Sequence, residues 1–298
     1  MTGGRALAGI ALNTIRETFR QPFYFLLMGV TIAALLVALL FPFFTFGYDT
    51  DMYKDLGLSF ILVFMLVAGV TAAATGVARE VEDRTAQTIL SKALGRWQFV
   101  VGKYLGVLAA VGVAIALVGV VFAAAVYYYV ALDAARGGGR GVPMGIGYEV
   151  EAFRALQWNQ ALTVTPGIVL VFLQVAVISA LATALSTRLS VLASVAVSLA
   201  MFVIGHLTVF LEGGMRAADE TVRGLTWGLL AAVPFLEIFN LNQKLSHTVL
   251  APLEVGTPGA AAWSAVWGYV GWASLYALAY VGFAVGLGVV LFRRRALG

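Results

Sequence analysis

Residues 56–85 read LGLSFILVFMLVAGVTAAATGVAREVEDRT, an uncharged apolar run followed at once by a dense group of ions. The apolar run, Leu56 to Ala78, is long enough at a rise of 1.5 Å per residue to cross a hydrocarbon core of about 30 Å. The ions that follow, Arg79 to Arg84, are costly to place inside that core. The stretch therefore predicts a transmembrane helix that ends at a membrane surface, with a charged segment outside the bilayer.

The composition of the whole chain is typical of integral membrane proteins. Of its 298 residues, 61% are hydrophobic and 11% are charged, whereas a soluble domain has about 25% charged residues. The chain has no cysteine and two widely separated histidines. No disulfide framework is therefore possible, and we expect no bound metal and no cofactor in this chain.

Six apolar segments are long enough to cross a bilayer, so the predicted fold is all-α, a single polytopic membrane domain over residues 1–298. The segments are 23–46, 56–78, 99–132, 166–187, 189–211 and 260–292. A seventh apolar stretch, within residues 225–250, is shorter and contains Pro234 and Glu237. We expect it to be a re-entrant or interfacial element on the outer side, with Asn240 and Asn242 as further polar groups.

Charge is distributed unevenly between the two sides that six spans define. One side holds both termini, residues 79–103 and Arg188, with 12 Lys and Arg against 4 Asp and Glu; the other holds the remaining 7 against 11. Since Lys and Arg concentrate in short cytoplasmic loops, we expect both termini in the cytoplasm. The predicted location is a cell membrane, with a bacterial inner membrane as the preferred one.

Two further elements are expected outside the spans. Residues 5–20 predict an amphipathic helix on the inner leaflet, with Arg5, Arg16 and Arg20 opposite its apolar face. It could be a plain membrane anchor or could transmit motion. Residues 133–165 predict an outer loop that is glycine-rich at first and then helical.

The charged patch itself predicts a short cytoplasmic helix over residues 79–97. Glu80 and Arg84 are spaced i, i+4, and the acids come early while Lys92 and Arg96 come late, as the helix dipole favours. We expect the helix to contact a soluble partner, and the alternative is that it lies on lipid headgroups. The residues expected to make the contact are Arg79, Glu80, Glu82, Asp83, Arg84, Thr85, Ile89, Leu90, Lys92 and Arg96.

Ionisable residues are scarce in the six segments. The six segments contain a single charged residue, Lys103, which lies at the edge of the charged patch. Ion-coupled carriers normally place such groups at membrane depth. Gln174 and His206 are the side chains that could make polar contacts there. If the protein moves a solute, we expect the energy to come from another subunit.

Two parts of the sequence carry a family resemblance. They are the patch with the residues that follow it, namely Glu80, Glu82, Arg84, Thr85, Ile89 to Lys92, Arg96, Gly102, Lys103 and Gly106, and the segment Pro234 to Leu241. The patch resembles a stretch of ABC-2 type permeases, the membrane subunits of ABC exporters. More narrowly, the chain is similar to the multi-copper-enzyme maturation and gliding-motility permease group. It departs from the family at Ala93 to Gly95, where a proline often precedes the arginine, and it has no His, Met or Cys cluster that could hold copper.

The resemblance implies a permease subunit that pairs with a second copy, or a related permease, and with two ATP-binding subunits. The chain lacks the Gly-x-x-x-x-Gly-Lys-Ser/Thr loop, so ATP and Mg²⁺ are expected in the partner subunit and the chain is not expected to be an enzyme by itself. The implied substrate is lipid-like or amphiphilic, moved by export. The expected partners include the lipid bilayer and no nucleic acid.

Two other functions remain open at this point. The chain could be a non-transporting scaffold that anchors a cytoplasmic complex through the same charged helix. It could also be an intramembrane enzyme with Ser179, Ser198 and His206 as candidate groups, although no Gly-x-Ser-x-Gly motif or paired carboxylate supports that hypothesis.

Overall fold

A computed structural model gives the fold for residues 3–41, 49–82, 95–136, 150–215, 233–240 and 260–293. All regular structure in these ranges is helical, which confirms the predicted all-α class. The elements are α1 (Gly3–Phe19), α2 (Pro22–Ala38), α3 (Asp49–Glu82), α5 (Arg96–Ala135), α6 (Val150–Leu162), α7 (Thr165–Leu185), α8 (Val191–Met215), η1 (Leu236–Phe239) and α11 (Ala260–Arg293).

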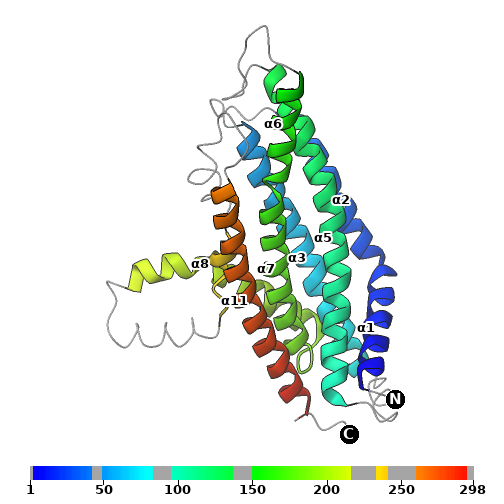
Figure 1. The fold of residues 1–298 in the computed structure, drawn as a ribbon. Helices are drawn as coiled ribbons and strands as arrows, with labels where there is room; N and C mark the ends of the chain where they lie inside the picture. The colour runs from blue at the N-terminus through cyan, green and yellow to red at the C-terminus, as the bar shows by residue number, and fades with distance from the viewer. Residues whose placement is uncertain are drawn as a thin grey trace.

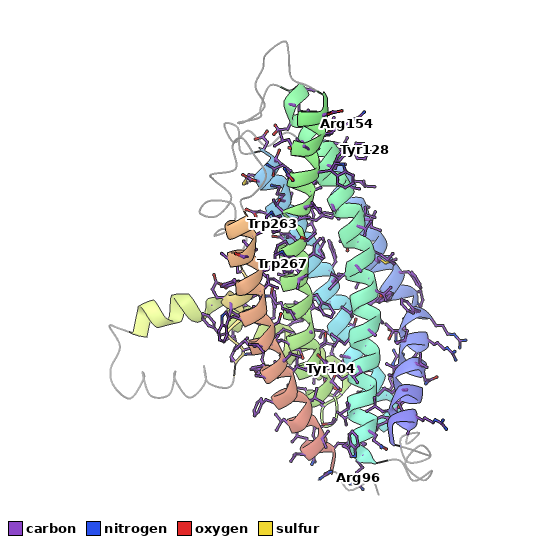
Figure 2. The ribbon with its side chains drawn as sticks, in the orientation of Figure 1. Arg96, Tyr104, Tyr128, Arg154, Trp263 and Trp267 are labelled. Atoms are coloured by element: carbon purple, nitrogen blue, oxygen red, sulfur yellow. The ribbon has the colours of Figure 1, made fainter. Side chains whose placement is uncertain are left out.

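The body of the molecule is formed by α3, α5, α7 and α11, which run roughly side by side (Figure 1). α7 packs against α11 and α3, and α5 packs against α1 and α3. α1 begins and α11 ends at the end of the bundle where α5 begins at Arg96 (Figures 1 and 2). We call this the charged end and the opposite one, where α6 continues into α7, the distal end.

Four helical segments are long and apolar enough to cross a membrane, namely Asp49–Glu80, Arg96–Ala135, Phe153–Leu185 and Trp263–Arg293. α1 and α2 are bent by 64° relative to each other and together could form a fifth, broken span. In α8 the apolar part, Val191–Leu207, is shorter than a span, and the helix extends sideways from the body (Figure 1). The described residues thus contain four or five candidate spans, fewer than the six segments that hydropathy predicts.

The observed helices differ from the predicted segments mainly at their ends. α2 ends at Ala38, although hydropathy alone continues to residue 46. α3 continues from Ala78 to Glu82, where the sequence has no Gly or Pro to end the helix. Residues 79–82 are therefore continuous with α3 rather than the start of a separate helix. Residues 83–94, most of the predicted cytoplasmic helix, lie outside the described residues.

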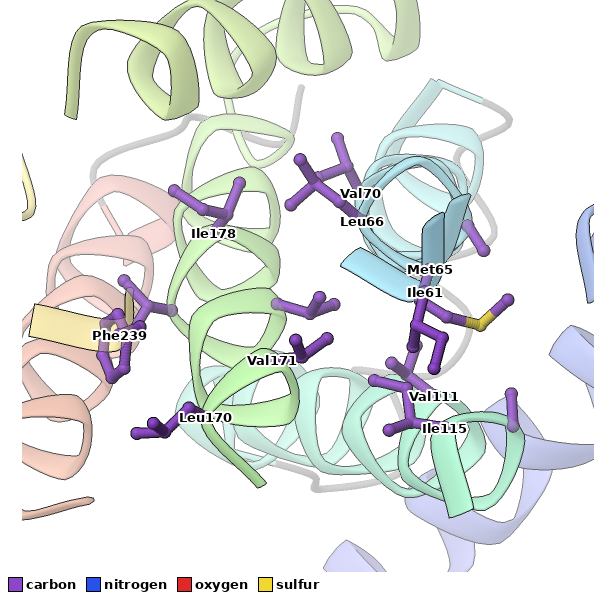
Figure 3. Packing of buried hydrophobic residues seen from close by; sticks show 14 of the residues in the cluster. Ile61, Met65, Leu66, Val70, Val111, Ile115, Leu170, Val171, Ile178 and Phe239 are labelled. Atoms are coloured by element: carbon purple, nitrogen blue, oxygen red, sulfur yellow. The ribbon is translucent and has the colours of Figure 1, made fainter. Parts of the chain in front are cut away.

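The core lies where α3, α5 and α7 meet, and η1 reaches it from the side (Figure 3). Between helices in a membrane, attraction comes from close van der Waals packing rather than from the exclusion of water. Buried apolar side chains of all four elements belong to one cluster, including Ile61, Met65, Leu66, Val70, Val111, Ile115, Leu170, Val171, Ile178 and Phe239.

α1 packs along the first turns of α5. A Cβ on Gly102 would lie 2.9 Å from Ile10, and a Cβ on Gly106 would lie 2.5 Å from Thr14 and 2.7 Å from the Ala11 carbonyl. The two glycines therefore let the helix backbones approach, as their small-xxx-small spacing suggests. Residues 5–20 are expected to lie on the inner leaflet, and in the structure the side of α1 that carries Ile10 and Thr14 instead faces α5.

Polar contacts and one ring stack join α3, α5 and α6 at the distal end. Thr50 of α3 donates a hydrogen bond to Asp133 of α5 at 2.8 Å, and the Tyr53 and Tyr129 rings stack at 4.4 Å. Lys54, which is buried, bonds to Gln160 of α6. α5 has 40 residues and is about 60 Å long, roughly twice the hydrocarbon thickness. These contacts therefore join α3, α5 and α6 at the distal end.

Candidate functional site at the charged end

Lys103 is a buried cation on α5, and its side chain is 3% exposed. Its Nζ lies 2.6 Å from Oε1 of Glu80 on α3 and 3.0 Å from Oε2 of Glu17 on α1. We call these three residues the Lys103 cluster. Charge-assisted hydrogen bonds are among the stronger ones, and removal from water strengthens them. The cluster therefore ties three helices together at the charged end.

The packing of α1 on α5 places this lysine between the two carboxylates. Gly102 and Gly106 bring α1 close to α5 on either side of Lys103, and Glu17 follows Thr14 by one turn of α1. Further along, the hydroxyl of Tyr24 donates to the Ala110 carbonyl at 2.6 Å. The ion pair thus lies within a close helix contact.

The end of α11 is also bonded to its neighbours at the charged end. Arg96, at the start of α5, donates to the carbonyl of Arg293 at 2.8 Å, and Arg188 donates to the carbonyl of Leu291 at 3.0 Å. Such bonds satisfy carbonyls that have no partner within the last turn of a helix. The start of α5 is thereby connected to α11 as well as to α1 and α3.

The ten residues predicted to contact a soluble partner divide into two groups. Arg79, Glu80 and Glu82 belong to the last turn of α3, where Arg79 is exposed and Glu80 joins the Lys103 cluster. Arg96 begins α5, after Gly95, whose backbone N–H donates to Oε1 of Gln98 at 3.0 Å. The remaining six, Asp83, Arg84, Thr85, Ile89, Leu90 and Lys92, lie outside the described residues.

Gln174 and His206, named separately from the sequence, lie together in the interior. Gln174 Nε2 is 2.9 Å from His206 Nε2, and His206 Nδ1 is 3.0 Å from the Phe202 carbonyl. The arrangement fits a neutral imidazole that accepts from the amide and donates through Nδ1. As for the two candidate serines, Ser198 donates to the Ser194 carbonyl, and Ser179 lies buried on α7. The contacts of His206 therefore bring it to an amide rather than to a nucleophile.

The re-entrant element was predicted within residues 225–250, and its described part, residues 233–240, contains η1. Leu236 and Phe239 are buried, and a Cβ on Gly205 would lie 2.7 Å from the Pro234 carbonyl. The backbone is satisfied by two tyrosines of α11. Tyr276 accepts from the Phe235 N–H at 2.8 Å, and Tyr269 donates to the Ile238 carbonyl at 2.7 Å. Irregular backbone that is buried among helices requires such partners.

Of the polar residues expected there, Glu237 accepts a long hydrogen bond of 3.4 Å from the Asn240 side chain. Both are at least partly exposed. Asn242 lies outside the described residues. The two described polar side chains of the element thus contact each other.

We expect His206→Leu to lower the free energy of unfolding by about 1–2 kcal/mol, because it leaves the buried Gln174 amide without its imidazole partner. The double variant Gln174→Leu, His206→Leu should recover most of that loss, since neither polar group remains. Thermal unfolding in detergent measures both variants. Gln174→Leu alone completes the comparison. If the loss of unfolding free energy in the double variant equals the sum of the losses in the two single variants, the contact contributes nothing to stability.

Several site residues were not found from the sequence. Tyr269 and Tyr276 went unnoticed, although a tyrosine hydroxyl within a span needs a hydrogen-bond partner and so marks a helix contact. Glu17 is one of the four acids on the side with both termini, and nothing in the sequence pairs it with Lys103.

Comparison with known proteins assigns no family: no protein-family model matches the chain, and no curated protein matches it significantly.

Proposed function

We propose that the chain is the permease subunit of an ATP-driven transporter of the ABC-2 type, which exports an amphiphilic substrate. One observation carries the proposal. The charged segment that resembles the partner-contacting stretch of such permeases connects α3 to α5 in sequence. Glu80 on the adjoining part of α3 and Lys103, about two turns into α5, form an ion pair. A force applied to the segment would therefore act on helices that are already joined.

The contacts at the charged end support a route for that force. In the proposed mechanism, two ATP-binding subunits dock on residues 79–97 and move them when the subunits close on ATP and Mg²⁺. The Lys103 cluster carries the motion to α1 and α3. The bond between Arg96 and Arg293 carries it to α11. The helices then rock as a group and open a path to a second copy of the chain or a related permease.

Glu82→Lys tests the proposal, because it reverses one charge in the segment that is expected to select the partner. We expect a tagged chain in mild detergent to bring down an ATP-binding subunit, and we expect Glu82→Lys to reduce that capture and the stimulation of ATP hydrolysis at least tenfold. Glu151→Lys is a matched control, since Glu151 is an exposed acid on α6 at the distal end.

Three outcomes discriminate between the functions. No captured ATP-binding subunit, or equal capture by the wild type and both variants, contradicts the proposal. Capture without any change in ATP turnover when amphiphilic substrates are added identifies a membrane scaffold instead. Turnover that responds to substrate and is lost in Glu82→Lys supports the transporter.

A further inference from the structure

The exposed face of α1 carries a band of positive charge. Arg5, Arg16 and Arg20 are exposed, and within the described part of the chain none of them belongs to an ion pair. The acidic residue of α1, Glu17, is engaged by Lys103 on α5. The arginines therefore present charge that no carboxylate of the described helices offsets.

This band runs directly into an apolar surface. Arg20 is followed by the start of α2, where Phe23, Phe25 and Leu26 are 47%, 49% and 58% exposed. Lipid tails are the natural surroundings of such side chains on a membrane helix. Arg16 and Arg20 are four residues apart, or about 6 Å along the helix. They therefore lie at the level where apolar surface gives way to charge, as it does on a membrane helix near the headgroups.

The bend between α1 and α2 holds the arginines at this level. The Phe19 ring packs against the Tyr24 ring edge-on, with centroids 5.6 Å apart, and lies 6.5 Å from Phe25. Tyr24 is in turn bonded to α5 through the Ala110 carbonyl. Thr14 and Thr18, on the inner face of α1, are buried. The arginine face is thus fixed relative to the lipid-facing part of α2.

We propose that Arg16 and Arg20 form a binding site for the headgroups of anionic phospholipids in the leaflet at the charged end. A guanidinium group binds phosphate oxygens in a bidentate manner, and an anionic leaflet attracts basic side chains near its surface. The apolar face of α1 is covered by α5, so α1 meets the bilayer through its arginine face. An acidic protein fits the site less well, because the apolar surface of α2 continues from it without a break. The proposal is independent of the transport function.

Native mass spectrometry of the full chain in a nonionic detergent, titrated with dioleoylphosphatidylglycerol or dioleoylphosphatidylcholine, tests the site. We expect the anionic lipid to bind more tightly than the zwitterionic one. Arg16→Gln together with Arg20→Gln should weaken binding of the anionic lipid about 25-fold, or about fivefold for each arginine. Arg16→Lys with Arg20→Lys should keep most of the affinity. Arg154→Gln, which removes an exposed arginine at the distal end, should leave it unchanged.

The proposal is overturned if the double glutamine variant binds phosphatidylglycerol as the wild type does, or if both lipids bind the wild type equally. It is also overturned if the variant keeps its lipid but loses an ATP-binding subunit, because the face is then a protein interface. Should the double variant fail to fold, Arg16→Gln and Arg20→Gln are measured singly. A fivefold loss in each supports the site, and no loss in either contradicts it.

Discussion

Lys103→Met is expected to destabilise the protein by about 2 kcal/mol and to separate partner binding from transport. The substitution removes the cation from between Glu80 and Glu17 while filling its space with a side chain of similar length. Breaking a fully buried ion pair typically costs about 3–5 kcal/mol. The smaller value is expected here because the Glu17 side chain is 37% exposed, so water screens part of the remaining charge.

Thermal unfolding in detergent measures the stability change, and stimulated ATP hydrolysis measures the coupling. If the proposed function holds, the variant should still capture an ATP-binding subunit but should no longer stimulate it, because the charged segment would move without α1. Arg154→Met is the control for loss of a positive charge, since Arg154 is exposed on α6 (Figure 2).

The triple variant Lys103→Met, Glu17→Gln, Glu80→Gln separates charge from packing. Without any of the three charges, no carboxylate is left beside an apolar side chain, so we expect more than half of the lost stability to return. ATPase stimulation should stay low, because the link between α1, α3 and α5 is still missing. Normal stability and normal stimulation in Lys103→Met would show that the cluster has neither role.

Gly106→Leu is expected to have the other large effect, a loss of about 3 kcal/mol and the detachment of α1 from α5. The first carbon of the new side chain would lie 2.5 Å from Thr14 and 2.7 Å from the Ala11 carbonyl. A backbone carbonyl cannot turn aside as a flexible side chain can, so the helices must separate. Gly286→Leu is the matched control, because a Cβ there meets nothing within 4 Å.

The absence of cysteine from the chain makes the detachment measurable. A single cysteine at Ala6, which is 9% exposed on α1, should react slowly with a maleimide in the otherwise unaltered protein. The same cysteine should react several-fold faster when Gly106→Leu is added, and no faster when Gly286→Leu is added. Equal rates in all three proteins would mean that the glycine contact does not hold α1 in place.

Hydropathy predicts where most of the helices begin and end in the sequence. It does not predict the direction in which each helix runs or which helices it contacts. α3, α7 and α11 begin and end within about seven residues of the predicted segments, because an apolar run of that length admits few other structures in a bilayer. α8 was predicted as a span for the same reason, yet it extends sideways from the body. An apolar sequence favours a helix surrounded by lipid or protein without specifying its angle to neighbouring helices.

The candidate sites were predictable residue by residue but not as pairs. Gln174 and His206 stood out because polar groups are rare in apolar segments, but nothing in their spacing joins them. Lys103 was recognised as part of the charged patch, whereas its contact with Glu17 depends on the way that Gly102 and Gly106 receive α1. Gly282 and Gly286 have the same spacing, but a Cβ on either would meet nothing within 4 Å. Identical patterns thus differ in role according to which helix lies opposite.

Because α5 is long, a small tilt of this helix at the charged end would displace its distal end by several ångströms. The helix has 40 residues, is about 60 Å long and is bonded to α3 and α6 at its distal end, so a rigid tilt of α5 would act on those helices as a lever. A tilt of about 5° about its first turn would displace the far end by about 5 Å, with no bending of any helix. Under the proposed transport function, angular leverage of this kind would let a change of contacts near Lys103 move the distal end.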